Sequence, residues 1–558
     1  MTQEFNIGLT HEAVSSVVPE REALVWRDRR FTYGGLTDRS RRLATYLRQA
    51  GLGVHRERPA LANYESGQDH VGLYLLNGNE YLEGMLGAFK ARCAPVNVNY
   101  RYVADELCYL FADAGVRGLI YHAAFAPVLS EVRERLPGLQ VLLQVDDGSG
   151  GPLLAGAVDY EEALASVPPG LPDVGHSPDD LYVLYTGGTT GMPKGVLWRQ
   201  HDIFMSAMGG RVPGVWDPVT SYDGVRERAL AGAGAADTMV LIPPLMHGAA
   251  QWATFIMMHL GVRVVIPDEN RRADPADILR AVERERASMI TVVGNAVMRP
   301  LLEEMTTGRY DLSSLAIIGN GGARLMPELK ERVLAFLPGL LINDSMGASE
   351  TGAQASHLSA KGAVSTGRFS AGPGAVVLTE GLDALHEPGH DGIGWLGQSG
   401  WIPLGYLGDQ EKTGRTFPVI GGVRYAVPGD RARLLGNGDV EVLGRDSVTI
   451  NTGGEKVFAE EVEEAIASHP AVLDVLVCGR PSERWGSEIV AVVQLRLASG
   501  GQVTEAELQT HLAQRLARYK LPKCWVFVTQ VQRSPSGKAD YRWARSVAEK
   551  ASAQALRP

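Results

Sequence analysis

A chain of 558 residues with 45% hydrophobic and 21% charged residues has the length and composition of a large folded protein, which excludes a single small module and global disorder. Its 54 basic and 64 acidic residues give a net charge of −10, so it lacks the overall basic surface that would hold a nucleic acid. The four cysteines form neither a C-x-x-C pair nor a dense framework: Cys93, Cys108, Cys478 and Cys524. We therefore expect reduced thiols that serve packing, no zinc site and a cytoplasmic location.

The N-terminal segment does not have the pattern of a secretory signal. It carries Glu4, Glu12 and Glu20 and lacks a basic stretch followed by an apolar run. The longest apolar candidate, 253–267, is interrupted by a histidine and an arginine and is too short to span a bilayer. We expect no integral membrane association.

The N-terminal part alternates between helix-like and strand-like segments. Helical patterns at 33–50 and 79–92 alternate with short apolar runs at 71–76 and 116–121, which predicts βα units around a largely parallel sheet. The same rhythm returns in further strand candidates, at 181–185, 239–243, 262–267, 289–293 and 315–319. Two α/β layers within one large body are therefore expected.

Two later segments depart from this rhythm. Residues 209–237 are rich in Gly, Pro, Ala and charge without a steady period, which predicts an inserted loop that covers a pocket. In 362–433, frequent Gly and Pro break short β-prone stretches, as expected for a small β unit.

The last section has the pattern of a separate α+β unit. One helix carries Glu460, Val462, Ala465 and Ile466, and another carries Leu508, Leu512 and Leu516 at four-residue spacing. Strand candidates lie between and after them. The predicted fold class is α/β, with an N-terminal domain of two α/β subdomains and a small β unit over 1–445, and an α+β C-terminal domain over 446–558.

The most informative segment follows the strand candidate 181–185. It contains Thr186 and Lys194 around a run of small residues: Gly187, Gly188, Thr189, Thr190 and Gly191. Glycines let the backbone approach an anion, hydroxyls add donors, and the lysine brings positive charge to a polyphosphate. Pro193 stands where the Walker motif has its second glycine, so the loop is not of that type. The alternative is a flexible turn with a solvated lysine.

This loop resembles the signature of the adenylate-forming (ANL) superfamily of acyl-CoA synthetases, nonribosomal adenylation domains and luciferases. Further motifs of the family follow in the expected order over nearly the whole chain: Gly319-Asn320-Gly321-Gly322-Ala323, Asp344-Ser345-Met346-Gly347-Ala348-Ser349-Glu350-Thr351, Tyr425 with Gly429-Asp430, Gly444-Arg445, Asn451-Thr452-Gly453-Gly454-Glu455-Lys456 and Pro535-Ser536-Gly537-Lys538. The resemblance implies ATP, Mg²⁺ and CoA as cofactors or substrates and a mobile C-terminal domain.

The resemblance also implies site residues. Lys538 would reach the α-phosphate and the acyl carboxylate, because attack of an anion on an anionic phosphate needs a cation to offset the repulsion. Glu350 and Thr186 would hold Mg²⁺ through oxygen ligands. The ribose would contact Asp430 and Arg445. The other residues expected around the nucleotide are Gly187, Gly188, Thr189, Thr190, Gly191, Lys194, Gly321, Gly322, Ala323, Met346, Gly347 and Ser349.

Residues for the acid and for CoA are implied in the same way. His247 is expected near the acyl carboxylate in a catalytic role, with a core histidine as the alternative, and Gln251, Trp252 and Gly321 are expected along the acyl pocket. Gly453, Gly454 and Lys456 would border a pantetheine tunnel, where glycine leaves a narrow wall. In the family the C-terminal domain rotates between the two half-reactions.

Three positions depart from the family pattern. Met346 stands where an aromatic ring often packs on adenine, Arg324 stands where proline is frequent, and Ser447 stands at the position of the usual hinge residue, with Asp446 one position early. These departures leave open whether both half-reactions are catalysed and which residue forms the pivot.

The predicted activity is that of an AMP-forming acid–thiol ligase. Strings such as Trp198-Arg199-Gln200 and Pro403-Leu404-Gly405-Tyr406 resemble actinobacterial synthetases for steroid side-chain acids, and the run at 255–258 contains two methionines. A bulky steroid or terpenoid acid is therefore expected ahead of a medium- or long-chain fatty acid. The alternatives are an enzyme of thioesterification alone, a nonribosomal adenylation module and a non-catalytic acyl- or nucleotide-binding protein. A homodimer is left open.

Overall fold

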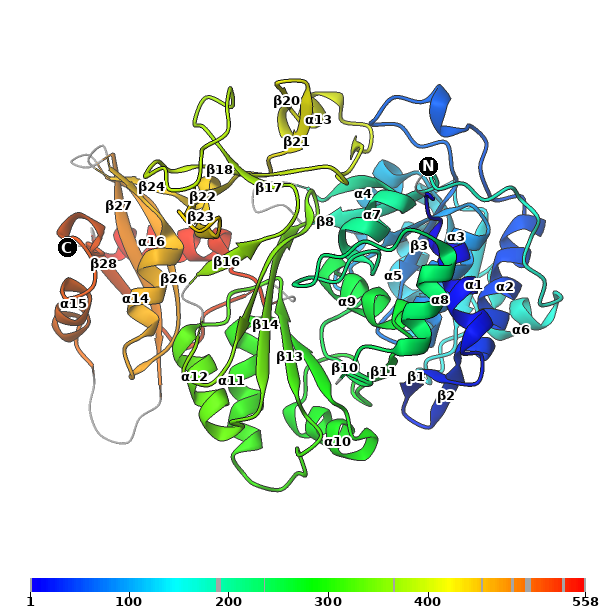
Figure 1. Cartoon of the computed structure of the whole chain (residues 1–558), viewed down its shortest axis with the longest axis horizontal. Helices are drawn as coiled ribbons and strands as arrows, with labels where there is room; N and C mark the ends of the chain where they lie inside the picture. Colours follow the sequence, from blue (N-terminus) through cyan, green and yellow to red (C-terminus); the bar gives the residue numbers. More distant parts are fainter. Residues whose placement is uncertain are drawn as a thin grey trace.

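The computed structural model describes residues 3–186, 192–234, 236–364, 367–452, 455–482, 486–496, 503–533 and 537–555. In Figure 1 the N-terminal body carries two large sheets with helices around them, and the C-terminal unit, in orange and red, lies at the opposite end from the blue N-terminal segments. Within the described residues, no helix combines the length and apolar character that crossing a bilayer requires.

The first sheet has eight strands in the order β19-β9-β8-β4-β3-β5-β6-β7. The strands β8, β4, β3, β5, β6 and β7 run parallel to one another, whereas β9 is antiparallel to β8, and β19 is antiparallel to β9. Their bounds are β3 His70–Tyr74, β4 Ala94–Asn97, β5 Val116–His122, β6 Val141–Val145, β7 Val158–Asp159, β8 Leu181–Thr186, β9 Lys194–Arg199 and β19 Gly405–Tyr406.

The second sheet begins as a parallel sheet and continues as an antiparallel one. Its parallel part has the order β1-β11-β10-β12-β13-β14, with β2 antiparallel at the edge. The bounds are β1 Glu22–Trp26, β2 Arg29–Thr32, β10 Thr238–Leu241, β11 Arg263–Ile266, β12 Met289–Val292, β13 Ile317–Gly321 and β14 Leu341–Ala348.

The antiparallel continuation forms the small β unit expected for 362–433. It comprises β15 Gly352–Ser359, β16 Arg368–Ala371, β17 Ala375–Leu378, β18 Gly394–Ser399, β20 Val419–Ile420, β21 Val423–Ala426, β22 Asp430–Leu434 and β23 Val440–Arg445. Its own small core contains Val377, Leu396, Ala432 and Val440. The α/β prediction is confirmed, and the predicted strands recur with their ends shifted by one or two residues.

Helices lie on both faces of the parallel strands, as βα connections require. Alternate residues of β10 show the layering: Val240 joins the core under α10, α11 and α12, whereas Met239 and Leu241 join the core shared with the first sheet. The helices of the N-terminal body are α1 Ile7–Val17, α2 Tyr33–Gln49, α3 Asn79–Lys90, α4 Ala104–Ala114, α5 Ala126–Val132, α6 Tyr160–Ala165, α7 Gln200–Ala207, α8 Tyr222–Ala231, α9 Gly248–His259, α10 Pro275–Glu285, α11 Gly294–Met305, α12 Pro327–Phe336 and α13 Gln410–Thr416.

The segment 209–237 is more ordered than its composition predicts. It contains α8, which begins after Ser221, whose hydroxyl accepts from the Gly224 amide. Val225 and Ala229 are buried on this helix, which packs against α1. The prediction of a plain loop was therefore wrong for its second half, because two buried residues and one cap suffice to fix a short helix.

The C-terminal unit is a three-stranded sheet between two layers of helices. Val475 and Val477 of β26 point to the core shared with α14 and α15, whereas Leu476 and Cys478 point to the core beneath α16. The bounds are β24 Ile450–Thr452, β25 Glu455–Val457, α14 Ala459–Ala467, β26 Val472–Ser482, β27 Gly486–Leu495, α15 Glu505–Ala513, β28 Cys524–Val528 and α16 Tyr541–Ala555. Its core begins at Val448, and a boundary between residues 445 and 446 stays a prediction.

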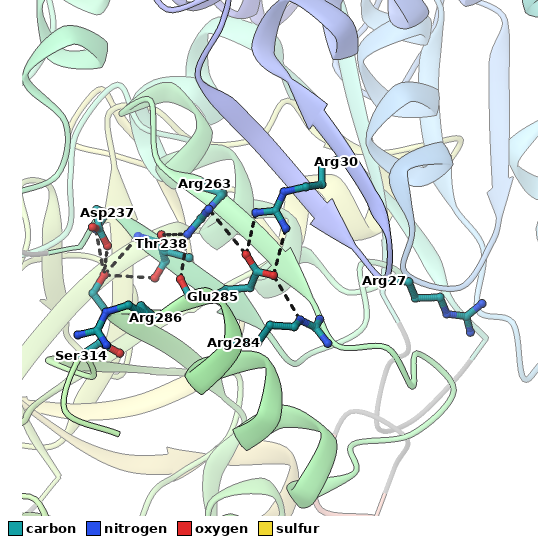
Figure 2. Close-up of a pocket in the computed structure, with 10 residues that line it drawn as sticks. Arg27, Arg30, Asp237, Thr238, Arg263, Arg284, Glu285, Arg286 and Ser314 are labelled. Atoms are coloured by element: carbon teal, nitrogen blue, oxygen red, sulfur yellow. Dashed lines mark hydrogen bonds and ion pairs between the residues drawn. The ribbon is translucent and has the colours of Figure 1, made fainter. Parts of the chain in front are cut away.

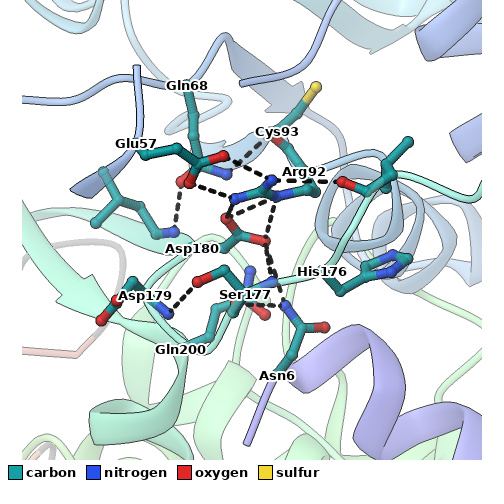
Figure 3. A network of polar contacts seen from close by, with 12 residues as sticks. Asn6, Glu57, Gln68, Arg92, Cys93, His176, Ser177, Asp179, Asp180 and Gln200 are labelled. Carbon is teal, nitrogen blue, oxygen red and sulfur yellow. Dashed lines mark hydrogen bonds and ion pairs between the residues drawn. The ribbon is translucent and has the colours of Figure 1, made fainter. Parts of the chain in front are cut away.

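A buried ion-pair network fixes the start of β8, the strand that leads into the glycine-rich loop (Figure 3). Arg92 is 5% exposed and donates to both carboxylate oxygens of Asp180, at 2.9–3.1 Å, and to Glu57 at 2.8 and 2.9 Å. Gln68 donates to the Arg92 carbonyl and accepts from the Leu181 amide. The register of β8 is thus tied to side chains of the preceding βα units.

We predict that Arg92→Met lowers the free energy of unfolding by about 3 kcal/mol, because it leaves the buried carboxylate of Asp180 without its cation. Thermal and urea unfolding followed by tryptophan fluorescence would measure the loss. The control is Arg56→Gln, which removes a half-exposed pair with Glu65 and should change little. Equal stability of Arg92→Met and the wild type would contradict this role.

Candidate functional site

A cavity of about 570 Å³ lies where the carboxyl ends of the parallel strands of both sheets meet. Parallel α/β sheets bind ligands at such edges. The wall includes residues at or just beyond the ends of five strands: Asn97, Thr186, Ile242, Val293 and Gly321. The same cavity is lined by Gly537 and Lys538 of the C-terminal unit. The site is therefore assembled from parts far apart in the sequence.

Lys538 projects into this cavity from the C-terminal unit. A Cβ atom built at Gly322 would lie 4.0 Å from Lys538 Cε, so the loop after β13 and the lysine side chain lie close together. Lys538 keeps part of its surface exposed to solvent. The protein around the ammonium nevertheless displaces bulk water, and this desolvation lowers its pKa; Arg445 adds to the effect, whereas Glu350 and Asp430 oppose it. Two carboxylates thus support a cation in an otherwise unfavourable place.

Glu350 occupies the tight turn between β14 and β15. It is 9% exposed, and the hydroxyl of Tyr406 donates to its Oε1 atom at 2.7 Å. A Cβ atom at Gly347 would lie 2.0 Å from the Gly352 carbonyl oxygen, so the chain can turn here only with glycine at 347. Tyr406 was not predicted as a site residue; its string, Pro403 to Tyr406, had been noted only for its resemblance to related enzymes.

Asp430 and Arg445 are direct partners across β22 and β23. Arg445 Nε donates to Asp430 Oδ1 at 3.3 Å. Burial raises the pKa of Asp430, and the positive charge of Arg445 opposes that rise. The pair predicted from separate motifs is therefore a single unit, and both charges act on Lys538.

Lys194 begins β9, directly opposite Thr186 at the end of β8. Its Nζ atom lies 3.6 Å from Asp113 Oδ1 and 3.9 Å from Asp409 Oδ2. Burial acts against its charge, but Asp113, Tyr109 and Asp409 outweigh burial and raise its pKa. The predicted phosphate-loop residues Gly187, Gly188, Thr189, Thr190 and Gly191 lie outside the described residues. We did not predict Asp113, on α4, or Asp409 as site residues from the sequence, because their shared partner, Lys194, is remote from both in the chain.

His247 lines the cavity immediately before α9. Burial lowers the pKa of its imidazole to about 3, and the charges of Lys538 and Arg101 contribute. Its Nε2 atom is buried and has no hydrogen-bond partner among the described residues. The imidazole is thus a neutral hydrogen-bonding group at the cavity wall.

Only one of the two predicted acyl-pocket residues on α9 lines the cavity. Trp252 does, together with Ile256 and Met257. Gln251 points into the core instead, where Tyr182 donates to its Oε1 atom at 2.6 Å and its amide donates to the Leu245 carbonyl. Its predicted place along the pocket is therefore wrong, because neighbouring residues of a helix point about 100° apart.

The two expected nucleotide loops lie side by side at the ends of β13 and β14. Asn320 donates to Asp344 Oδ1 at 2.9 Å and to the Ala323 carbonyl, and Lys330 pairs with the same aspartate at 2.5 Å. Of the predicted residues on these loops, the cavity is lined by Gly321, Gly322, Met346, Gly347 and Ser349, but not by Ala323 or Glu350. Met346 also packs on the small core beneath β16 and β23.

Of the predicted CoA residues, Gly453 and Gly454 lie outside the described residues, and Lys456 belongs to β25. No cluster of three or more His, Cys, Asp or Glu side chains that could hold a metal exists among the described residues. The carboxylate of Glu350 and the hydroxyl of Thr186 are nevertheless suitable oxygen ligands for Mg²⁺. Substrate phosphates would supply the remaining ligands.

A second hollow, which is polar, is lined by residues of β2, β10, β11 and the end of α10 (Figure 2). Three of its arginines, Arg30, Arg263 and Arg284, contact the single carboxylate of Glu285. Arg30 and Arg263 also pair with Glu22. Because neighbouring carboxylates already compensate these charges, the hollow is an ion-pair network that joins the edge hairpin of the second sheet to β11 and α10.

A cleft between two parallel sheets, with a lysine delivered by a small separate unit, is the architecture of adenylate-forming enzymes. A family model described as AMP-binding enzyme matches residues 11–400, and one for the AMP-binding enzyme C-terminal domain matches 461–538. The chain belongs to the AMP-binding enzyme family and is an AMP-forming acyl-CoA synthetase, an acid–thiol ligase.

Individual relatives span the whole chain. A medium-chain acyl-CoA ligase, Mig, of Mycobacterium avium is 56% identical over 98% of this chain and 99% of its own. A 3-oxocholest-4-en-26-oate–CoA ligase of Rhodococcus rhodochrous is 39% identical over 97% and 95%. The crystal structure of the anthranilate CoA ligase AuaEII with anthranoyl-AMP shares the fold, with a TM-score of 0.83, 21% identity and 99% coverage of both chains.

We predict that His247 stays neutral between about pH 5 and pH 8, because its burial lowers its pKa to about 3. Between pH 6.5 and 3 the unfolded chain binds a proton that the folded chain does not, so this residue lowers stability as the pH falls. NMR of histidine ring protons, with the resonance assigned from its loss in His247→Gln, measures the titration. A midpoint near 6.5 would contradict the prediction.

Proposed function

We propose that the chain activates a medium-chain fatty acid with ATP as an acyl-adenylate and then transfers the acyl group to CoA. The observation that carries the first step is the position of Lys538 inside the cavity, with its charge balanced by Glu350 and Asp430. In that step a carboxylate oxygen attacks the α-phosphorus, and the bond to the β-phosphate breaks with release of pyrophosphate.

Lys538 serves this step as the cation that offsets negative charge. Both reactants are anions, and charge grows on the phosphorus oxygens in the transition state, so an ammonium in a cavity surrounded by protein stabilises it more than it would in water. Burial lowers the pKa of Lys538, whereas the nearby carboxylates of Glu350 and Asp430 oppose that fall and so favour the charged ammonium. Lys194 would neutralise the outer phosphates.

Glu350 and Thr186 would hold Mg²⁺ against the phosphates. The phenol of Tyr406 occupies one oxygen of Glu350 and leaves Oε2 without a hydrogen bond among the described residues, which suits a metal ligand. When bound, the ion would draw negative charge from the phosphate oxygens. The carboxylate of Asp430 would accept hydrogen bonds from the ribose hydroxyls, and Arg445 would hold that carboxylate in its orientation. Met346, Gly347, Ser349, Gly321 and Gly322 would border the adenine and phosphates.

The acid would enter with its carboxylate toward His247 and its chain along α9. Because the imidazole is neutral, its Nε2 atom can donate a hydrogen bond to the carboxylate without adding a charge. Trp252, Ile256 and Met257 give this part of the cavity an apolar wall. An aliphatic chain fits such a wall, since each buried methylene contributes about 0.8 kcal/mol.

In the second step the CoA thiol attacks the acyl carbonyl, AMP leaves, and the thiol proton is released. We propose that the unit beginning at residue 446 rotates to withdraw Lys538 and to bring Gly453, Gly454 and Lys456 to the pantetheine path. Ser447 and Asp446 lie at the pivot. We further propose that the enzyme works in the cytoplasm; a homodimer stays a prediction.

The medium-chain acid is proposed first because the 56% identical relative bears that name, whereas the relatives named for a steroid side-chain acid are 38–39% identical. This reverses the order expected from the sequence alone. The bulky steroid or terpenoid acid is the second candidate, and the relative from Mycolicibacterium smegmatis, named for medium- and long-chain fatty acids as well as the steroid acid, supports keeping it.

We predict that thioester formation is fastest with linear acids of about six to twelve carbons. The purified chain would be incubated with ATP, Mg²⁺ and CoA and with linear acids of increasing length, cholestenoic acid and a terpenoid acid, and acyl-AMP and acyl-CoA would be measured separately by mass spectrometry. A higher kcat/KM for cholestenoic acid than for every linear acid would favour the second candidate. Acyl-AMP without any thioester would contradict the second step.

We predict that Lys538→Ala lowers adenylate formation by about 10²- to 10³-fold, as expected for one charged group that stabilises the transition state. Transfer from presynthesised acyl-AMP to CoA should change less than about threefold, because that step does not need this cation. Lys361→Ala, on an exposed turn, is the matched control. An equal loss in both half-reactions would contradict the role of Lys538.

A further inference from the structure

Arg324 joins the N-terminal body to the C-terminal unit through a side-chain contact, in addition to the chain connection at residues 445–446. It lies in the loop after β13, and its Nη1 atom is 2.8 Å from Glu464 Oε2 on α14. Both side chains are about one-third exposed, at 36% and 28%. The loop therefore contacts the C-terminal unit directly through a charge-assisted hydrogen bond.

The same loop also lies close to Lys538. A Cβ atom built at Gly322 would lie 4.0 Å from Lys538 Cε, and one built at Gly537 would lie 3.3 Å from the Val293 carbonyl oxygen. Thus the loop after β13 contacts Glu464 and lies close to Lys538, two residues of the C-terminal unit that are 74 positions apart. The orientation that forms the ion pair is the orientation that places Lys538 in the cavity.

The shape of the interface is built for an arginine at this position. A Cβ atom at Gly367 would lie 2.4 Å from Arg324 Nη2, so glycine there leaves room for the guanidinium. The φ angle of Gly367 is +84°, in the region that favours glycine. The arginine that departs from the family pattern is thus accommodated by its surroundings.

The helix α14 is rich in carboxyl groups, so a positive charge placed against its surface is favourable. This helix carries Glu460, Glu461, Glu463 and Glu464 within nine residues, and Glu328 of α12 in the N-terminal body acts on Glu464 with like charge. Lys520 pairs with Glu461 within the C-terminal unit. Arg324 offers the compensating positive charge to Glu464 from across the interface.

We propose that Arg324 is a positioning residue for adenylation: its ion pair with Glu464 holds the C-terminal unit in the orientation that keeps Lys538 in the cavity. The inference rests on the proposed two-step function. It adds that the Arg324–Glu464 pair affects the rate of adenylate formation relative to the rate of thioester formation. Breaking the pair depopulates the adenylation orientation and leaves the orientation for thioester formation unaffected or more populated.

The test compares the two half-reactions in Arg324→Gln and Glu464→Gln. Adenylate formation should fall roughly two- to fivefold, as for loss of a partly exposed ion pair, while transfer from presynthesised acyl-AMP to CoA stays equal or rises. The charge-swapped double variant Arg324→Glu with Glu464→Arg should recover at least half of the lost adenylation rate. Arg332→Gln on α12 removes an exposed arginine with the same change in charge and should leave both rates unchanged.

A substrate-independent measurement accompanies the kinetics. Hydrogen–deuterium exchange of the α14 amides should increase in both single variants and return toward the wild-type level in the charge swap. An equal fall in both half-reactions, unchanged rates or no recovery in the swap would overturn the proposal. If the wild type forms neither acyl-AMP nor acyl-CoA, the proposed function itself fails; if it forms both and Arg324→Gln keeps the wild-type ratio, only the positioning role fails.

Discussion

The chemistry of this site depends on holding a lysine ammonium in a cavity surrounded by protein. Burial there acts against the positive charge and lowers the pKa of Lys538. Glu350 and Asp430 supply the opposing negative charge, and each is itself fixed by a partner, Tyr406 for Glu350 and Arg445 for Asp430.

The fold brings these groups together from two directions. The parallel strands of both sheets end at the cavity and place Thr186 and the loops after β13 and β14 there. The small C-terminal unit provides Lys538. This arrangement is compatible with the proposed two-step reaction, in which the unit would bring Lys538 to the first step and withdraw it for the second.

The sequence predicted most of the architecture because glycine-rich turns and apolar periodicity are local signals. The βα order and the small β unit were predicted in this way, and the motifs placed Asp430 and Arg445 near the same ribose, although their direct pairing was not predicted. Tyr406, Asp113 and Asp409 were not, since their roles come from contacts with residues far away in the chain. Gln251 was misplaced because its closeness to His247 in the sequence does not tell which face of α9 borders the cavity. The helix α8 was missed because it depends on packing against α1.

The central claim is that one cavity receives both the nucleotide and the acid while Lys538 lies between them. A crystal structure with a non-hydrolysable acyl-sulfamoyl adenosine tests it most directly. We predict that the ribose hydroxyls lie within hydrogen-bond distance of Asp430, the acyl chain along Trp252 and Met257, and Lys538 Nζ within hydrogen-bond distance of the acyl carbonyl or the sulfamoyl oxygens. An analogue bound elsewhere, or bound in this cavity with Lys538 pointing away from it, would contradict the account.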